Sequence, residues 1–260
     1  MKENILHIAG QTIRSEAKSV LQLENNLTAD FEKAVEAIYY CSGRIVVTGV
    51  GKSAIVAQKM VATFNSTGTP AVFMHAADAI HGDLGMMQKE DVMVVVSNSG
   101  NSSEIKTLLP LLKQLAQTII AITGNLQSNL AAGAHFIINA SVTEESCPHN
   151  LAPTNSTTVQ MVVGDALAVC LMKLNHFKEE DFARFHPGGN IGKRLYLWVE
   201  DLYKINEKPE VLFETPVKKV INEISGKRLG CTAVINDEDK LIGIITDGDI
   251  RRMLEKTDNI

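Results

Sequence analysis

The sequence lacks the features that mark nucleic-acid-binding, membrane and secreted proteins. Its 25 Lys and Arg residues are outnumbered by 30 Asp and Glu residues, which gives a net charge of −5 at pH 7. A nucleic-acid groove needs clustered basic side chains, so this balance argues against one. No segment approaches the roughly 18 to 20 uninterrupted apolar residues of a membrane helix, and the polar N-terminus lacks the apolar core of a signal peptide. We therefore expect a cytoplasmic protein with no nucleic-acid or membrane partner.

Cysteine and aromatic residues are also scarce. The four cysteines lie far apart in the sequence, at Cys41, Cys147, Cys170 and Cys231. Because no two of them form a Cys-x-x-Cys pair, neither a structural zinc site nor a disulfide framework is indicated. Aromatic residues make up 5% of the chain, yet apolar residues reach 45% and charged residues 21%. This balance is typical of a globular protein with reduced thiols.

The first part of the chain alternates between apolar runs and helical patterns. Amphipathic periodicity predicts helices over 3–23 and 27–40 before the first strand. The predicted strands are 44–48, 72–75, 91–97, 118–123 and 134–140, and the later helices are 53–66, 102–115 and 157–175. Runs such as "VMVVV" are apolar at successive positions, which indicates strands covered on both faces. The pattern predicts an α/β domain over 1–198, with three αβα layers around a parallel sheet of about five strands.

A smaller unit is predicted after this domain. Charges and two prolines interrupt the periodicity after Trp198, and we interpret 199–205 as a linker. Residues 206–260 then predict a small α+β module with the order α-β-β-α, made of helix 216–225, strands 231–236 and 240–246, and helix 247–256. A unit of this size buries little surface, so we expect it to pack on something else.

The stretch "VVTGVGKSA" combines an apolar strand, a glycine turn and the start of a helix. A Walker nucleotide loop needs a glycine where this sequence has Val46, and a dinucleotide-binding loop needs a third glycine where it has Ser53 and Ala54. Both interpretations are therefore excluded. What remains is a glycine turn beside a helix N-terminus, with Lys52 in the first helical turn. Because the helix dipole disfavours a cation there, a functional Lys52 is favoured over a merely solvated one.

A second constellation, "SNSGNSSE", follows the buried strand that ends near Ser97. Hydroxyl groups and free N–H groups at a helix start can bind a phosphate monoester without a metal. The alternative is helix capping, with Ser102 as the N-cap and Glu104 in the first turn. The position at the carboxyl end of a central parallel strand favours ligand binding. The segment 154–158, "TNSTT", offers the same chemistry at the start of another helix.

Ionisable residues gather in three irregular segments. They are His75, Asp78, His81 and Asp83 in the first segment, Glu144, Glu145 and His149 in the second, and His186 in the third. No two histidines have the spacing of a helical zinc site, so a catalytic metal is not indicated. Each histidine alone is as compatible with a structural role as with a catalytic one. Together with the phosphate-type loops, these groups point to proton transfer on a phosphorylated small molecule.

The segments "SNSGNSSE", "GVGKSA" and "HGDLGM" resemble the sugar isomerase (SIS) domain family. With "ESCPHNLAPTNSTTVQMVVGDALA" and "HPGGNIGKRL" added, the chain resembles the arabinose-5-phosphate isomerases of Gram-negative bacteria over essentially its whole length. "TAVIN" and "LIGIITDGDIRRML" resemble one CBS motif. The resemblance implies interconversion of D-ribulose 5-phosphate and D-arabinose 5-phosphate through an enediol, at the start of Kdo and lipopolysaccharide biosynthesis. It also implies a homotetramer whose sites are shared between subunits, with no required cofactor.

The resemblance assigns roles to individual residues. The catalytic residues that it implies are Lys52, Glu104, Glu145, His186 and His81. We expect a glutamate to move the proton, with Glu145 preferred over Glu104, and His186 or His81 to assist ring opening. Lys52 would steady the developing negative charge. The expected substrate-binding residues are Gly49, Gly51, Ser53, Gly68, Thr69, His81, Ser97, Asn98, Ser99, Ser102, Thr154, Ser156 and Thr157. His75 matches a position implicated in binding an inhibitory zinc ion.

Two alternatives and one departure accompany this interpretation. A phosphosugar sensor that binds without catalysis would share the fold, but no helix-turn-helix or basic segment precedes the domain. An isomerase of another phosphosugar would keep the chemistry and change the substrate. The departure is that the second CBS motif of the family is absent, so we expect no self-contained nucleotide cleft. Either the sequence is part of a longer chain, or the single motif pairs with another subunit.

Overall fold

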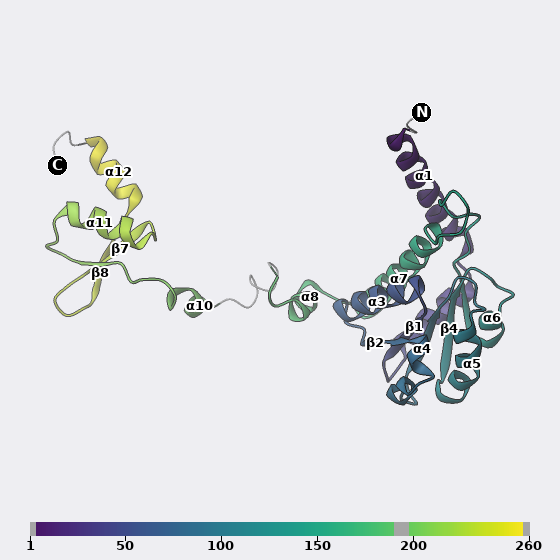
Figure 1. Ribbon diagram of the computed structural model, residues 1–260. Coiled ribbons are helices and arrows are strands. Elements are labelled where there is room, and N and C mark those ends of the chain that lie inside the picture. Colours follow the sequence, from purple (N-terminus) through teal and green to yellow (C-terminus); the bar gives the residue numbers. More distant parts are fainter. Residues whose placement is uncertain (1–3, 190–197, 257–260) are drawn as a thin grey trace. The chain divides into compact units, whose positions relative to one another are not determined.

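The computed structural model describes residues 4–189 and 198–256 (Figure 1). The chain divides into two compact units, Met1–Gly192 and Lys193–Ile260, and each is described by itself. Residues 190–197, which belong to the first predicted domain and contain part of the "HPGGNIGK" segment, lie outside the described residues. The predicted boundaries after residues 198 and 205 stay predictions.

The larger unit alternates strands and helices along the sequence. In chain order it contains α1 (Ile5–Leu23), η1 (Glu24–Asn26), α2 (Ala29–Tyr39), β1 (Ile45–Gly49), α3 (Lys52–Ser66), β2 (Ala71–His75), α4 (Ala76–Ala79), η2 (Asp83–Met86), β3 (Val92–Val96), α5 (Ser103–Leu115), β4 (Thr118–Thr123), α6 (Asn129–Gly133), β5 (Phe136–Asn139), α7 (Asn155–Leu174) and α8 (Glu179–Phe185). Local capping chemistry sets several helix starts. Thr28, for example, accepts a hydrogen bond from the backbone N of Asp30 at the start of α2.

The five strands form one parallel sheet with the order β2-β1-β3-β4-β5. Successive side chains of each strand enter different cores, because they point to opposite faces of the sheet. Val47 and Val94 belong to the core under α2, α3 and α7, whereas Val46 and Met93 belong to the core under α4, α5 and α6 (Figure 1). The predicted three-layer αβα fold with a five-stranded parallel sheet is confirmed.

The strand order places two loops at one edge. After β1 the chain moves outward to β2 and then returns to the other side of β1 to form β3. In open parallel sheets of this order, ligands bind beside the carboxyl ends of the two strands where the winding direction reverses. Here these strands are β1, which leads into the glycine turn, and β3, which leads into the serine-rich loop.

The long helix α7 is a core helix. By length and composition alone it is apolar enough to cross a membrane. However, it packs against α1, α2 and α3, and its side chains Val159, Val163 and Leu167 are fully or almost fully buried in the core. The central helix of a globular protein passes the same compositional test, so the prediction of a long buried helix is confirmed.

The smaller unit contains one strand more than predicted. Its elements are α10 (Val199–Tyr203), β6 (Glu210–Leu212), α11 (Val217–Lys227), β7 (Cys231–Ile235), β8 (Leu241–Thr246) and α12 (Asp247–Lys256). β6 pairs in parallel with β7, and β7 pairs antiparallel with β8. The predicted order α-β-β-α is therefore incomplete, because the three residues of β6 are too few to show a strand pattern. The predicted linker 199–205 also includes the short helix α10.

Candidate active site

The glycine turn brings the start of α3 against the end of β1. Gly51 adopts φ 59° and ψ −128°, which a side chain would strain. At Gly49 a Cβ atom would lie 2.9 Å from the backbone carbonyl carbon of Ser53, so only glycine allows this close approach. Lys52 is exposed in the first turn of α3, and the Oγ of Ser53 donates to Oε1 of Gln160 on α7 at 3.3 Å. The predicted turn with Lys52 at the carboxyl edge is present.

The serine-rich loop after β3 is tightly folded around Gly100. Ser97 Oγ accepts a hydrogen bond from Gly100 N at 3.1 Å, and Ser102 Oγ caps α5 by accepting from Ile105 N at 3.4 Å. Gly100 has φ 61°, and a Cβ there would lie 2.2 Å from Ser128 Oγ. In both contacts the serine oxygen accepts, so neither contact uses the hydroxyl proton; the proton of Ser102 is directed to Glu104. While Ser102 caps α5, the loop can still offer the Ser97 hydroxyl group as a donor to a phosphate.

Glu104 lies in the first turn of α5, directly after this loop. Its own backbone N–H and the hydroxyl groups of Ser102 and Ser103 lower its pKa. Ser103 Oγ donates to Glu104 Oε2 at 3.1 Å. His75 ends β2 at the same carboxyl edge of the sheet, and its positive charge lowers the pKa of Glu104 further. Glu104 is thus a charged group at the predicted phosphate loop.

His75 and His81 flank α4, at the carboxyl end of β2. His75 Nδ1 lies 3.7 Å from Asp78 Oδ2. Within residues 4–189 and 198–256, no group of three or more His, Cys, Asp or Glu side chains could hold a metal ion together. His81 is exposed and is followed by Gly82, whose φ of 133° lets the chain turn into η2.

Glu145 lies in the loop between β5 and α7. Its Oε2 accepts hydrogen bonds from Thr154 N at 2.8 Å, from Thr154 Oγ1 at 3.0 Å and from Ser156 N at 3.2 Å. Burial raises the pKa of Glu145, but the hydrogen bonds from Ser156 and Thr154 outweigh burial and hold the pKa below its ordinary value. Glu145 also lines a cavity of about 490 Å³ between this loop and residues Ile8, Thr12 and Ser15 of α1. The structure thus brings three predicted site residues together: Glu145, Thr154 and Ser156.

Two buried amides at this edge were not named as site residues, although Asn155 is part of the predicted segment 154–158. Asn155 is fully buried, and its Nδ2 donates to Ser15 Oγ at 2.8 Å and to the carbonyl oxygen of Glu144 at 2.9 Å. Gln160 is also fully buried and receives the hydrogen bond from Ser53. The available signal was the presence of amide side chains within an otherwise apolar helical pattern, since buried polar groups need partners.

Three predicted site residues lie at the other edge of the sheet. Gly68 and Thr69 follow α3 and precede β2, and a Cβ at Gly68 would lie 3.0 Å from Phe177. His186 follows α8, where its ring stacks on Phe182 with centroids 4.0 Å apart and its Nδ1 donates to the Phe182 carbonyl oxygen at 2.9 Å. These residues lie near the end of α3, about 21 Å along the helix from Lys52. One chain therefore does not bring them together with Lys52.

Sequence comparison with known proteins identifies the family of this chain. The SIS domain family model matches residues 38–170, and the CBS domain family model matches residues 199–256. A Pseudomonas aeruginosa protein named arabinose 5-phosphate isomerase KdsD is 48% identical over 259 residues, which cover 98% of this chain and 79% of that protein. The chain belongs to the SIS-domain arabinose 5-phosphate isomerase family. A Francisella tularensis member of this family is also 48% identical, over 95% of this chain and 76% of its own length.

Solved structures agree with the family. A putative sugar-phosphate isomerase from Listeria monocytogenes has a TM-score of 0.70 and 38% identity, covering 72% of this chain and 99% of that chain. A protein of Escherichia coli CFT073, solved in complex with arabinose 5-phosphate, has a TM-score of 0.69 and 38% identity, covering 72% of this chain and 100% of that chain. The larger unit therefore has the fold of the SIS sugar-phosphate isomerases.

Proposed function

We propose that this chain is an aldose-ketose isomerase that interconverts D-ribulose 5-phosphate and D-arabinose 5-phosphate through an enediol. The observation that carries the proposal is the 48% identity, along 98% of the chain, to an arabinose 5-phosphate isomerase KdsD. A protein with 38% identity binds arabinose 5-phosphate in its solved structure, which supports the same substrate here. The reaction would supply Kdo and lipopolysaccharide biosynthesis in the cytoplasm.

The carboxyl edge offers the chemistry that a phosphosugar needs. Ser97, Ser99 and Ser102 present hydroxyl groups beside the N-terminus of α5, where backbone N–H groups and the helix dipole favour an anion. Lys52 lies across the switch point on α3 and would stabilise the negative charge of the enediolate. Moving a proton between neighbouring carbons needs only acid and base groups. We therefore propose that the chain requires no cofactor and that His75 contributes at most to an inhibitory zinc site.

Glu145 remains our first candidate for the proton carrier, with Glu104 as the second. Three hydrogen bonds to the Glu145 carboxylate, from Thr154 N, Thr154 Oγ1 and Ser156 N, end on Oε2. These contacts hold Oε2, so Oε1 is the oxygen that would take the substrate proton. The lowered pKa keeps this carboxylate charged at neutral pH, as a base must be before the reaction. His81 or His186 would assist ring opening.

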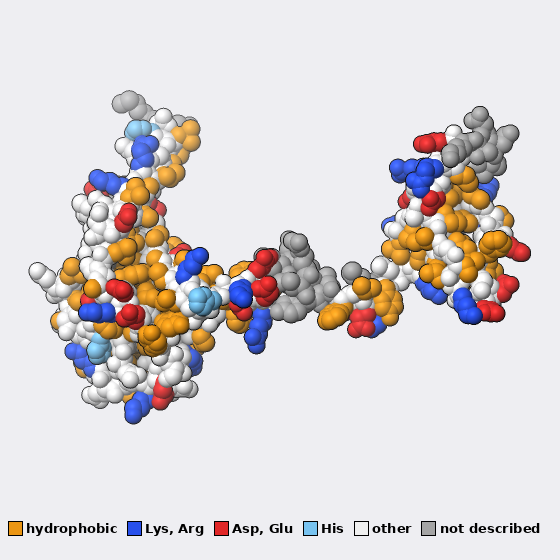
Figure 2. All heavy atoms as spheres, turned by 180° about the vertical axis from the view of Figure 1, so that it is seen from behind, with side chains coloured by type: hydrophobic (Ala, Val, Ile, Leu, Met, Phe, Trp, Pro, Cys, Tyr) orange, Lys and Arg blue, Asp and Glu red, His pale blue; other side chains and the backbone are white. Residues whose placement is uncertain are grey.

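We further propose a homotetramer whose active sites are shared between subunits. His186, Gly68 and Thr69 lie at the edge opposite Lys52, so they would serve the site of another subunit. Helix α1 exposes apolar side chains that its own chain leaves uncovered, and Figure 2 shows hydrophobic atoms along its side. Ile5, Leu6, Ile13 and Leu21 are 77%, 83%, 68% and 72% exposed. Covering this helix by a second copy would remove that surface from water.

One assay tests the reaction. The protein is incubated with ribulose 5-phosphate in deuterated water, and the sugar phosphates are analysed by NMR. Arabinose 5-phosphate carrying deuterium at C2 is the expected product, because the enediol exchanges its proton with solvent. Absence of arabinose 5-phosphate would contradict the assignment, and turnover of another ketose phosphate alone would favour an isomerase of a different sugar.

A further inference from the structure

The connection between β2 and β3 crosses from one edge of the sheet to the other. It leaves the carboxyl edge after His75, forms α4, passes His81 and continues through η2 to the start of β3. His81 is the one predicted catalytic residue on this connection. What fixes the far end of the connection therefore also affects where His81 lies.

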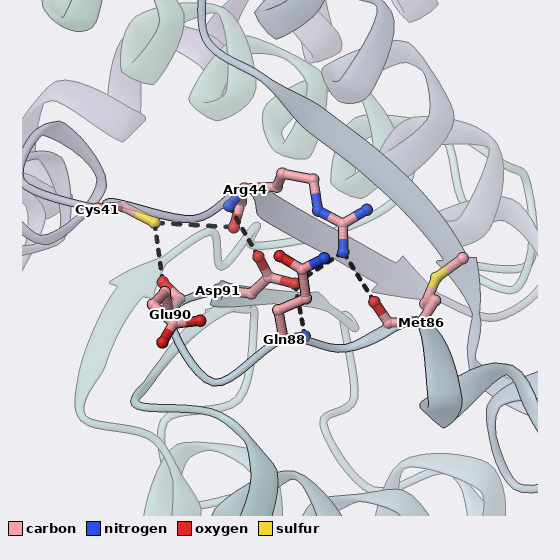
Figure 3. Close-up of polar contacts among 6 residues, drawn as sticks. All are labelled: Cys41, Arg44, Met86, Gln88, Glu90 and Asp91. Atoms are coloured by element: carbon pink, nitrogen blue, oxygen red, sulfur yellow. Dashed lines mark hydrogen bonds and ion pairs between the residues drawn. The ribbon is translucent and has the colours of Figure 1, made fainter.

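Two charged residues at the amino edge hold that far end (Figure 3). Arg44, immediately before β1, donates from Nη2 to the carbonyl oxygen of Met86 at 2.7 Å and to Asp91 Oδ2 at 3.1 Å. The same Asp91 oxygen accepts from Gln88 N at 2.9 Å, and Asp91 Oδ1 accepts from Arg44 N at 2.8 Å. Asp91 is fully buried, so its charge depends on these donors. We call Arg44, Asp91 and their contacts to Met86 and Gln88 the clamp.

The stretch between the clamp and His81 is short and internally bonded. Gly85 N donates to the carbonyl oxygen of Gly82 at 2.9 Å, and Met87 N donates to that of Leu84 at 3.1 Å. Leu84 and Met87 also pack against the core under α4 and α5. A displacement at Met86 would therefore pass along η2 to His81 instead of being absorbed by loose chain.

We propose that Arg44 is a positioning residue for the isomerisation, because the clamp fixes η2 and thereby the place of His81 at the active site. This inference rests on the proposed function. Removing the guanidinium group would leave the Met86 carbonyl oxygen and the buried Asp91 carboxylate without this donor. The segment would relieve both by moving toward water, and His81 would lose its fixed place.

The geometry also predicts which substitution preserves the clamp. One nitrogen, Nη2, makes both side-chain contacts of Arg44. A single ammonium group can make the same two contacts, so Arg44→Lys should retain the clamp and Arg44→Met should lose it. Lys59→Met is a matched control, because Lys59 pairs with Asp165 on α7 and has no contact with the clamp.

The kinetic test measures kcat and KM for ribulose 5-phosphate in the full chain and these variants. We expect Arg44→Met to lower kcat about 10- to 100-fold with little change in KM, the size of effect that misplacing a catalytic group produces. Arg44→Lys should restore most of kcat. In a His81→Ala background, Arg44→Met should cause no further loss, because it acts through His81. A kcat for Arg44→Met equal to that of Lys59→Met, or losses that multiply with His81→Ala, would overturn the inference.

A second measurement does not depend on activity. Amide hydrogen exchange in the peptide 80–89 should be faster in Arg44→Met than in the wild type and Lys59→Met, and unchanged exchange would overturn the inference. If the wild-type chain fails to isomerise any ketose phosphate, the proposed function fails and the catalytic role of Arg44 fails with it. Faster exchange in that case would still establish the clamp, so the two failures are distinguishable.

Discussion

The carboxylate of Glu145 accepts a hydrogen bond at 2.8 Å from the backbone N of Thr154, the residue that precedes α7. This contact ties the loop after β5 to the N-terminus of the central helix, where partial positive charge favours a carboxylate. Because three hydrogen bonds from Thr154 and Ser156 end on Oε2, the residue can hold the loop with that oxygen and carry a proton on the other. Its structural and catalytic roles are separable by experiment.

Glu145→Gln should keep the shape of the side chain and remove its ability to take a proton. We expect kcat to fall about 10²- to 10⁴-fold, the usual contribution of a positioned acid-base group. Glu144→Gln, at the exposed neighbouring position, should leave kcat nearly unchanged. Steady-state kinetics measure kcat for both variants, and circular dichroism checks that each variant is folded. Nearly normal turnover of a folded Glu145→Gln variant would assign the base role to Glu104 instead.

The same residue makes stability depend on pH. Because the pKa of Glu145 is lower in the folded chain than in the unfolded chain, its charge stabilises the fold above the unfolded pKa, and this contribution is lost as pH falls through the folded pKa. Urea unfolding should therefore show a gap between wild type and Glu145→Gln that is largest at neutral pH and closes in acid. The expected gap at pH 7 is about 1 kcal/mol, typical of a lost helix cap. A gap independent of pH would contradict this role.

Local patterns were sufficient to predict most of the sheet. The strand 118–123 coincides with β4, and the run "VMVVV" coincides with β3, because consecutive β-branched residues bounded by turns leave few other structures. β6 was missed because its three residues gain their pairing from β7, some twenty residues later in the sequence. The short helix α6 was also missed. Its five residues are too few to show a helical pattern, and its N-cap Ser128 stands in a polar turn.

Site residues were predictable from sequence patterns only where residues close together in the sequence form the binding loop. The glycine turn and the serine-rich loop each follow a strand, so their common edge follows from the parallel sheet. The hydrogen bonds of Glu145 depend on where α7 packs, which no local pattern contains. The separation of His186 from Lys52 depends likewise on the chain returning past the far end of α3. A resemblance assigns such residues to one site without stating which chain supplies each.

Gly100 should tolerate no side chain. A Cβ at this position would overlap Ser128 Oγ, and φ 61° is unfavourable for alanine. We expect Gly100→Ala to lower the free energy of unfolding by about 2 to 4 kcal/mol and to raise KM by distorting the serine-rich loop. Gly226→Ala is the control, because a Cβ there meets nothing within 4 Å. Urea titrations of both variants test this, and equal stabilities would show that the loop adapts.

Lys52→Met should distinguish stabilisation of the enediolate from binding of the phosphate group. If Lys52 acts on the developing negative charge, kcat falls about 10²- to 10³-fold while KM changes little, as for loss of an oxyanion donor. This is the outcome that we expect. A rise in KM with an unchanged kcat would instead place the ammonium group on the phosphate. Lys59→Met, on the same helix, controls for loss of a positive charge from α3.

Sharing of sites between subunits predicts that two inactive variants can restore activity together. Glu104 lies at the carboxyl edge with Lys52, whereas His186 lies at the opposite edge of the same chain. If the site joins Glu104 of one subunit to His186 of another, subunits carrying Glu104→Gln and His186→Ala will assemble some sites in which both residues are intact. Co-expressed variants should then regain part of the wild-type kcat, whereas each variant alone stays slow. A mixed assembly, verified by differently tagged subunits, that stays as slow as its parents would show that each site draws both residues from one chain.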